Sequence, residues 1–203
     1  MPNRHFAQTQ YPILSCLSQR WSPRAFDPAR TVSDAVLHRL FEAARWSASS
    51  YNEQPWRFFL ARREADAANY EKAIACLIEP NQAWARQAPV LVLTAVSTRF
   101  THNNTPNRCA VHDLGLAVGN LSAQATHEGL CVHQMGGVLL EKMRETYGIP
   151  AGFDPFTAIA IGHPTSPAAV PENMRQMETA PRQRKALDDI VFGGQWESKS
   201  GIF

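Results

Sequence analysis

Apolar residues recur at helical spacing in several stretches of the chain. The clearest such stretch follows Ser33, a residue type that favours the N-cap of a helix. It runs to about Trp46, and its apolar positions share one face: Val36, Leu37, Leu40, Phe41 and Ala44. The same spacing predicts helices over residues 11–19, 64–77, 109–128 and 138–147.

Short apolar runs of strand length separate these helices, over residues 56–61, 89–96, 131–135 and 156–161. The run over 89–96 is continuously apolar, as expected of a strand buried on both faces. Strands that alternate with helices favour a three-layer α/β or α+β sandwich. Because the chain shows no internal repeat and no linker, we expect residues 1–203 to form a single domain.

The tail, residues 165–203, lacks this order. It is rich in Pro, Met and Arg, and no periodicity organises it before residues 186–192. Such a long irregular segment is unusual in a compact domain. It is therefore either disordered or laid across another subunit.

Composition excludes several classes of protein. The chain has 203 residues, 44% of them hydrophobic and 19% charged, and a formal net charge of +2. This near-neutral balance argues against a nucleic-acid-binding protein, which usually needs a concentrated basic face. No apolar run approaches the ~18 residues of a membrane helix, and no signal-peptide core follows the N-terminus. We therefore expect a soluble, cytoplasmic protein without a membrane partner.

Common catalytic and ligand-binding motifs are missing from the sequence. It contains no G-x-G-x-x-G after a strand, no P-loop, no G-x-S-x-G and no H-E-x-x-H. The cysteines Cys16, Cys76, Cys109 and Cys131 are too scattered for a metal site or a disulfide scaffold, and we interpret them as reduced core thiols. No metal site is expected. Asp113 and Asn120 share one face of the helix predicted over 109–128 and are interpreted as polar groups at a helix interface or on the surface.

Three segments carry polar or cationic side chains at short spacing. The first is Arg20-Trp21-Ser22-Pro23-Arg24, in which alternate residues of an extended chain place two guanidiniums and a hydroxyl on one side. This donor pattern suits an oxyanion such as phosphate, although a solvated surface would also explain it. The second is the polar loop, residues 47–55, and the third is Arg182-Gln183-Arg184-Lys185 in the tail. Turn chemistry and a solvated charge run are the plain alternatives for these two.

Taken together and in this order, the segments resemble the nitroreductase family of FMN-dependent NAD(P)H oxidoreductases. The resemblance spans about residues 20–190 and rests on the segments over 20–28, 43–58, 81–84, 128–130, 160–164 and 182–184. One departure is that the family usually has Ala-Pro-Ser-Ser where this chain has Ser47-Ala48-Ser49-Ser50. The missing proline puts the shape of that loop in doubt, not the cofactor.

The resemblance implies an α+β fold with three layers (α/β/α) around a central mixed, mostly antiparallel sheet. It also implies a domain-entwined homodimer in which the FMN sites are shared between subunits and the tail over 165–203 wraps the partner.

The resemblance further implies a set of cofactor-binding residues. Arg20 and Ser22, beside Trp21, would bind the FMN phosphate together with Arg182 and Arg184. Arg24 and Asn81 would address the pyrimidine edge of the flavin, where a cation favours the reduced form. The turn Gln134-Met135-Gly136-Gly137 would lie against the isoalloxazine, with a glycine N–H directed at N5. The partner subunit would supply the residues Ala48, Ser49, Ser50, Asn52 and Gln54.

The implied function is a ping-pong transfer of hydride from NAD(P)H, through flavin N5, to a nitroaromatic, quinone or similar small acceptor. No acid–base side chain is needed for this chemistry, so no catalytic residue is predicted. Two alternatives stay open: other flavin chemistry on the same fold, such as reductive dehalogenation or flavin fragmentation, and a non-enzymatic flavin-binding dimer. The stretch over residues 98–107 is short for the substrate lid that the first alternative generally adds.

Overall fold

A four-stranded antiparallel sheet forms the centre of the molecule. The computed structural model describes residues 6–203, so the first five residues of the predicted domain lie outside it. The strands are β1 (Trp56–Arg62), β2 (Val90–Ser97), β3 (Cys131–Met135) and β4 (Phe153–Gly162), in the order β1-β2-β4-β3. Every neighbouring pair of strands is antiparallel. The sheet formed by these four strands of one chain therefore lacks the parallel pair that a mixed sheet would contain.

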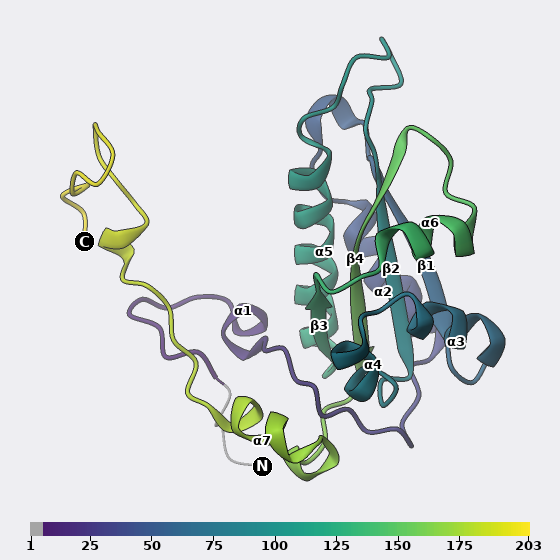
Figure 1. The fold of residues 1–203 in the computed structure, drawn as a ribbon. Coiled ribbons are helices and arrows are strands. Elements are labelled where there is room, and N and C mark those ends of the chain that lie inside the picture. Colours follow the sequence, from purple (N-terminus) through teal and green to yellow (C-terminus); the bar gives the residue numbers. More distant parts are fainter. Residues whose placement is uncertain (1–5) are drawn as a thin grey trace.

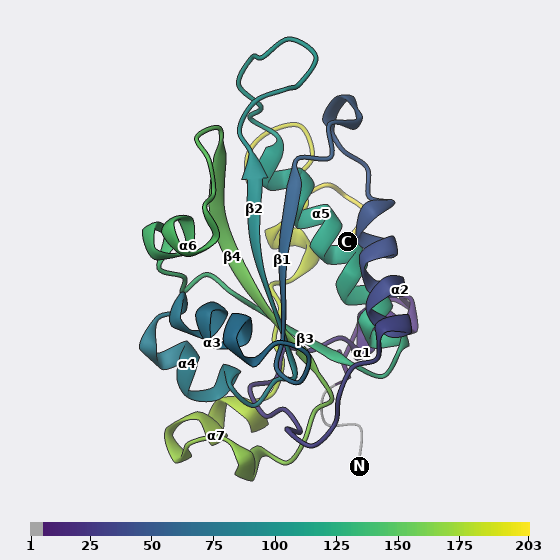
Figure 2. The same ribbon diagram turned by 90° about the vertical axis from the view of Figure 1, so that its right-hand side faces the viewer.

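Helices cover both faces of this sheet and produce the three layers predicted (Figures 1 and 2). On one face lie α2 (Asp34–Arg45) and α5 (Ala110–His127), and on the other lie α3 (Ala67–Ala75), α4 (Glu79–Ala85) and α6 (Leu140–Tyr147). The side chains of β2 alternate between the two cores. Val90, Val92 and Val96 pack towards α2 and α5, whereas Leu91, Leu93 and Ala95 pack towards the other helices.

The four predicted strands, and the helices predicted after Ser33 and over residues 109–128 and 138–147, are confirmed within a few residues of their bounds. The helix expected over 64–77 is the shorter α3, whose N-cap Asp66 accepts a hydrogen bond from the Asn69 N–H. The separate α4 after it was not predicted, and Pro80 in its first turn explains why the pattern reads as a break. The helix expected over 11–19 is reduced to the five-residue α1 (Ser15–Gln19), which buries no side chain.

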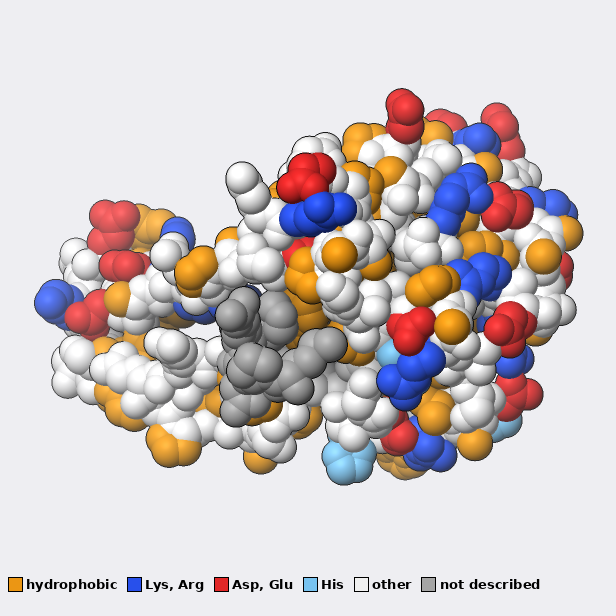
Figure 3. Space-filling model, turned by 90° about the horizontal axis from the view of Figure 1, so that it is seen from below, with side chains coloured by type: hydrophobic (Ala, Val, Ile, Leu, Met, Phe, Trp, Pro, Cys, Tyr) orange, Lys and Arg blue, Asp and Glu red, His pale blue; other side chains and the backbone are white. Residues whose placement is uncertain are grey.

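The N-terminal arm and the tail leave the main body on the same side. Figure 1 shows the tail passing from α7 (Glu172–Thr179) beside the arm that carries α1 and then away from the sheet. Figure 3, a view from below Figure 1, shows hydrophobic side chains exposed on the projecting part. Trp196 is 81% exposed, Ile202 76% and Leu14 70%, which is unusual for such large apolar side chains.

The cysteines only partly match the expectation of core thiols. Cys76 and Cys131 are buried, whereas Cys16 and Cys109 are half-buried. Burial raises the pKa of the Cys131 thiol to about 12, so this sulfur is protonated and unreactive at neutral pH. Within residues 6–203, no helix combines the length and apolar character needed to cross a membrane.

Candidate functional site

The arginine segment, residues 20–28, is extended and fixed beside the end of β4. Phe26 pairs with Pro164 in an isolated bridge, the Asp27 N–H donates to the His163 carbonyl (2.8 Å), and the Thr165 N–H donates to the Ala25 carbonyl (3.0 Å). Pro23 and Pro28 prevent this segment from forming a helix. The backbone is therefore held in the extended form in which alternate side chains point the same way.

Three arginines that are far apart in the sequence surround one cavity. Arg20, Arg182 and Arg184 line a cavity of about 550 Å³, together with the apolar side chains Ile13 and Leu17 of the N-terminal arm. The Arg20 Nη1 donates to Ser22 Oγ (2.9 Å), and Arg182 Nη1 donates to the Ser18 carbonyl (3.2 Å). The structure thus brings together the four residues predicted to bind a phosphate.

The three guanidiniums affect one another electrostatically. Burial, with the charge of Arg184, lowers the pKa of Arg20, and burial, with the charges of Arg20 and Arg184, lowers the pKa of Arg182. Among the described residues, neither Arg20 nor Arg184 forms an ion pair. An anion placed between these cations would relieve their mutual repulsion.

Arg24 lies next to this cluster but in a different environment. Its guanidinium is 3.9 Å from Glu178 Oε1 and 6.0 Å from the centre of the Trp84 ring. Trp84 also packs against His133, with ring centres 4.5 Å apart. Trp21, a predicted site residue in the arginine segment, packs against the hydrophobic core.

His133 is a neutral hydrogen-bond donor at neutral pH. Burial is the main reason that its pKa falls to about 4, and the charges of Arg24 and Arg20 lower it further. Its Nδ1 is 2.8 Å from the Pro23 carbonyl, which can only accept, so Nδ1 carries the proton. His133 therefore fixes the arginine segment against β3.

The glycine turn, residues 134–137, begins with the last two residues of β3 and meets α4. The Gly137 carbonyl accepts hydrogen bonds from the Ile78 N–H (3.1 Å) and from Asn81 Nδ2 (3.2 Å). A Cβ on Gly137 would lie 2.6 Å from Asn81 Nδ2, whereas a Cβ on Gly136 would meet nothing within 4 Å. Gln134 and Gly136 are exposed, and the Met135 side chain is buried in the core, so Met135 presents only its backbone.

The polar loop lies at the opposite end of the sheet from the arginines. The first residue of β1, Trp56, pairs with Val96, whereas the last, Arg62, pairs with Val90 beside the end of β4 that contacts the arginine segment. Seven residues of β1 at ~3.3 Å each span about 20 Å. Figure 2 shows the residues before β1 at the upper end of the sheet, with α1 and α7 at the lower end. Within one chain, the sixteen predicted residues thus form two separate groups: the polar-loop group of Ala48, Ser49, Ser50, Asn52 and Gln54, and all the others.

The polar loop is held by α5. The Ser50 N–H donates to Asp113 Oδ2 (3.1 Å), and Asn120 Nδ2 donates to Ser47 Oγ (2.7 Å). This confirms the interpretation of Asp113 and Asn120 as polar groups at a helix interface. Asn52 and Gln54 have φ values of +54° and +52°, in the left-handed region that non-glycine residues rarely adopt. Such strain is commonly retained where a loop has a function.

Sequence reasoning missed Glu178, Trp84 and His133, which surround Arg24. Glu178 lies in the tail, where no apolar periodicity marks a helix, and His133 alternates with core residues in an ordinary strand pattern. No local signal in the sequence distinguishes Glu178 or His133, whereas Trp84 lies in the segment over 81–84 that carries the resemblance but was not assigned to the site.

Comparison with known proteins identifies the family. The sequence model described as the nitroreductase family matches residues 17–163. This chain belongs to the nitroreductase family. The match begins just before the arginine segment and ends before the tail, so Glu178, Arg182 and Arg184 lie outside it. The predicted family and its α+β fold with an antiparallel sheet are both confirmed.

Individual relatives agree with this assignment. An uncharacterized 15.4 kDa protein of Mycolicibacterium smegmatis is 31% identical over 145 residues, covering 69% of this chain and 97% of the relative. The major NAD(P)H-flavin oxidoreductase of Aliivibrio fischeri is 31% identical over 94 residues, covering 46% of this chain and 43% of that enzyme.

Solved structures extend the likeness over the whole fold. The crystal structure of an oxidoreductase containing FMN has a TM-score of 0.88 and 32% identity, covering 98% of this chain and 100% of that one. A nitroreductase family protein from Clostridium difficile 630 has a TM-score of 0.69 and 18% identity, covering 91% and 99%, and shows the shared fold.

Proposed function

We propose that this nitroreductase-family chain is an FMN-dependent oxidoreductase that uses NAD(P)H to reduce a small acceptor. The observation that carries the proposal is the gathering of Arg20, Arg182 and Arg184 around one cavity, with the Ser22 hydroxyl in hydrogen-bond contact with Arg20. Guanidiniums and a hydroxyl form the donor set that suits a phosphate dianion. The relatives include an NAD(P)H-flavin oxidoreductase and an oxidoreductase containing FMN, which supports a flavin phosphate as the anion.

The residues near the arginines also fit the flavin ring. Arg24 and Asn81 would address its pyrimidine edge, and the backbone N–H of Gly136 or Gly137 would face N5. The open space above Gly136 allows close approach of a flat ring to the backbone. When bound, FMN would supply the redox chemistry, accepting hydride from NAD(P)H and passing it to a nitroaromatic or quinone in ping-pong order.

The chain's own residues would bind, orient and tune the cofactor. Arg20, Ser22, Arg182 and Arg184 would hold the phosphate, and Arg24 would place a positive charge where reduction adds negative charge. His133 keeps the arginine segment in position through the Pro23 carbonyl. No side chain is assigned a proton transfer.

We also propose that the site is shared across a homodimer. The polar loop lies about one strand length from the arginines of its own chain, so it would complete the partner's site instead. The exposed apolar side chains of the tail, such as Trp196 and Ile202, support wrapping of residues 165–203 around the partner. Residues 1–203 would then form a single domain whose tail beyond α7 is packed only in the dimer.

The experiment is purification followed by cofactor analysis and steady-state kinetics. The protein should be yellow, release FMN on denaturation, and oxidise NADH or NADPH when menadione or a nitrofuran is added. Extracted FAD, or a colourless protein that ignores added FMN, would overturn the proposal. Flavin binding without NAD(P)H oxidation would instead support a non-enzymatic flavin-binding dimer.

A further inference from the structure

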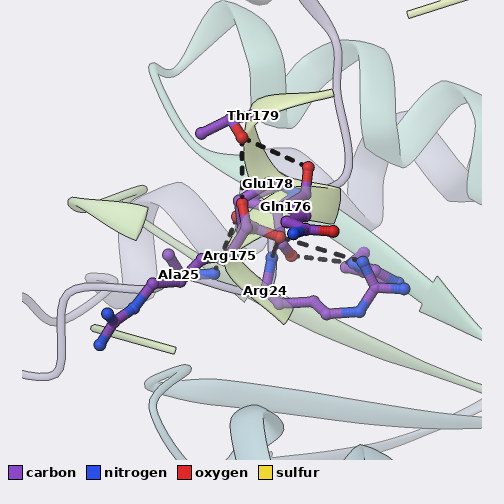
Figure 4. Close-up of polar contacts among 8 residues, drawn as sticks. Arg24, Ala25, Arg175, Gln176, Glu178 and Thr179 are labelled. Atoms are coloured by element: carbon purple, nitrogen blue, oxygen red, sulfur yellow. Dashed lines mark hydrogen bonds and ion pairs between the residues drawn. The ribbon is translucent and has the colours of Figure 1, made fainter. Parts of the chain in front are cut away.

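Glu178 is a buried carboxylate in a mostly exposed tail. It lies in α7 and is only 3% exposed, whereas the other charged residues of that helix are exposed or half-buried. Its Oε1 accepts a hydrogen bond from the Arg24 N–H (2.8 Å), and its Oε2 accepts one from the Ala25 N–H (3.3 Å). Figure 4 shows the Glu178 side chain pointing at the backbone of these two residues.

These contacts offset the free-energy cost of burying the Glu178 carboxylate. A buried carboxylate is costly unless hydrogen bonds and charge compensate it. Here two backbone donors and the Arg24 guanidinium, 3.9 Å from Oε1, provide that compensation. The dependence is mutual, because Ala25 is fully buried and its N–H would lose its acceptor if Glu178 were removed.

The position of Glu178 in the chain connects this contact to the three arginines of the cavity, Arg20, Arg182 and Arg184. Arg182 and Arg184 follow four and six residues later, after α7 ends at Thr179. Four extended residues span at most about 14 Å, so a fixed Glu178 restricts where Arg182 can lie. The tail therefore reaches Arg20 from a point that is anchored on the arginine segment itself.

We propose that Glu178 is a positioning residue that docks the tail on Arg24 and Ala25 and thereby places Arg182 and Arg184 against Arg20. The identity of the anion rests on the proposed FMN function, whereas the docking does not. The cofactor's phosphate site is thus assembled by one carboxylate that lies beyond the part of the chain matched by the family.

The docking is tested by hydrogen exchange on the protein without FMN. In Glu178→Ala, the amides of Arg24 and Ala25 should exchange at least tenfold faster than in the wild type. Trypsin should also cleave faster after Arg182 and Arg184.

Glu178→Gln retains one carbonyl acceptor, so one of the two amides should stay protected. Glu172→Gln makes the same change at an exposed site on the same helix and should alter neither amide. Unchanged exchange in Glu178→Ala would overturn the docking.

If Glu178→Ala does not fold, Glu178→Gln decides the question alone. Loss of one acceptor must then raise the exchange of at least one of the two amides, and unchanged exchange of both would overturn the docking.

The role in the phosphate site is tested by comparing FMN with riboflavin, which lacks the phosphate. Glu178→Ala should weaken FMN binding at least tenfold, equivalent to about 1.4 kcal/mol, and riboflavin binding less than twofold. Glu178→Gln should recover most of the FMN affinity. Equal losses for both ligands would indicate general destabilisation and would overturn the positioning role. A wild-type chain that binds no FMN would overturn the proposed function and this role together, while the exchange result still judges the docking.

Discussion

Gly137 is the position in the glycine turn where a single methyl group should do the most damage. A Cβ there would lie 2.5 Å from Ile78 Cδ1, 2.7 Å from Ile78 Cγ1 and 2.6 Å from Asn81 Nδ2. In Gly137→Ala, Ile78 and Asn81 must therefore move. Asn81 would then lose its hydrogen bond to the Gly137 carbonyl.

The expected cost is modest because the ends of both side chains can shift. Overpacking costs typically about 1–3 kcal/mol, and a lost hydrogen bond adds roughly 1 kcal/mol. We expect Gly137→Ala to lower the free energy of unfolding by about 2 kcal/mol. For a chain of this length, that corresponds to a fall in Tm of roughly 4–8 °C.

Gly136→Ala is the matched control. A Cβ on Gly136 meets nothing within 4 Å in this chain, so the stability of the protein without FMN should change by less than about 0.5 kcal/mol. If the flavin lies against this turn, the same substitution should still weaken FMN binding. Urea unfolding of both variants, with FMN titration of each, separates the two effects. Equal stability of the two variants would refute the packing argument, and unchanged FMN affinity of Gly136→Ala would refute the placement of the flavin.

Four further predictions follow from the site. His133 has a pKa near 4 instead of its ordinary 6.5, so the folded state disfavours its protonated form; stability should be full above pH 6.5 and fall as the pH drops towards 4, by up to about 3 kcal/mol. His133→Asn should remove this part of the pH dependence in urea unfolding at pH 7 and pH 5, and a profile that stays as steep as that of the wild type would contradict it. Arg24→Ala, saturated with FMN, should lower the midpoint potential by roughly 30 mV for each 1.4 kcal/mol of lost stabilisation, and an unchanged potential would remove Arg24 from the redox role. Asp113→Ala should free the Ser50 N–H and weaken FMN binding by the dimer, whereas unaltered affinity would separate the polar loop from the cofactor. Light scattering should find a dimer at micromolar concentration, held by an interface above ~2,000 Å², and a folded monomer that retains flavin would argue against the shared site.

The sequence predicted the layers of this fold because periodicity reports burial. The run over 89–96 is the fully buried β2, and the pattern after Ser33 is α2 with its N-cap. The same method missed α4 and α7, because α4 has a proline in its first turn and α7 buries only Glu178. A helix that packs through one carboxylate and the partly buried Met174 has too short an apolar stripe to detect.

The candidate site was predictable as a set of residues but not as an arrangement. The motifs identified Arg20, Ser22, Arg182 and Arg184, and the fold brings them together. Glu178 and His133, which fix the backbone on which Arg24 sits, could not be predicted because hydrogen bonds between distant segments leave no pattern in the sequence. The separation of the polar loop from the arginines became visible only with the strand register.

The central claim is that Arg20, Arg182 and Arg184 together bind the phosphate of FMN. Its most direct test is titration of the apoprotein with FMN and with riboflavin, in the wild type, in Arg20→Ala and in the exposed control Arg30→Ala. We predict one FMN per chain, bound at least tenfold more tightly than riboflavin by the wild type and by Arg30→Ala. The preference should be lost in Arg20→Ala, because charge-assisted hydrogen bonds to the dianion are removed. Absence of FMN binding, or equal affinity of the wild type for FMN and riboflavin, would contradict the claim.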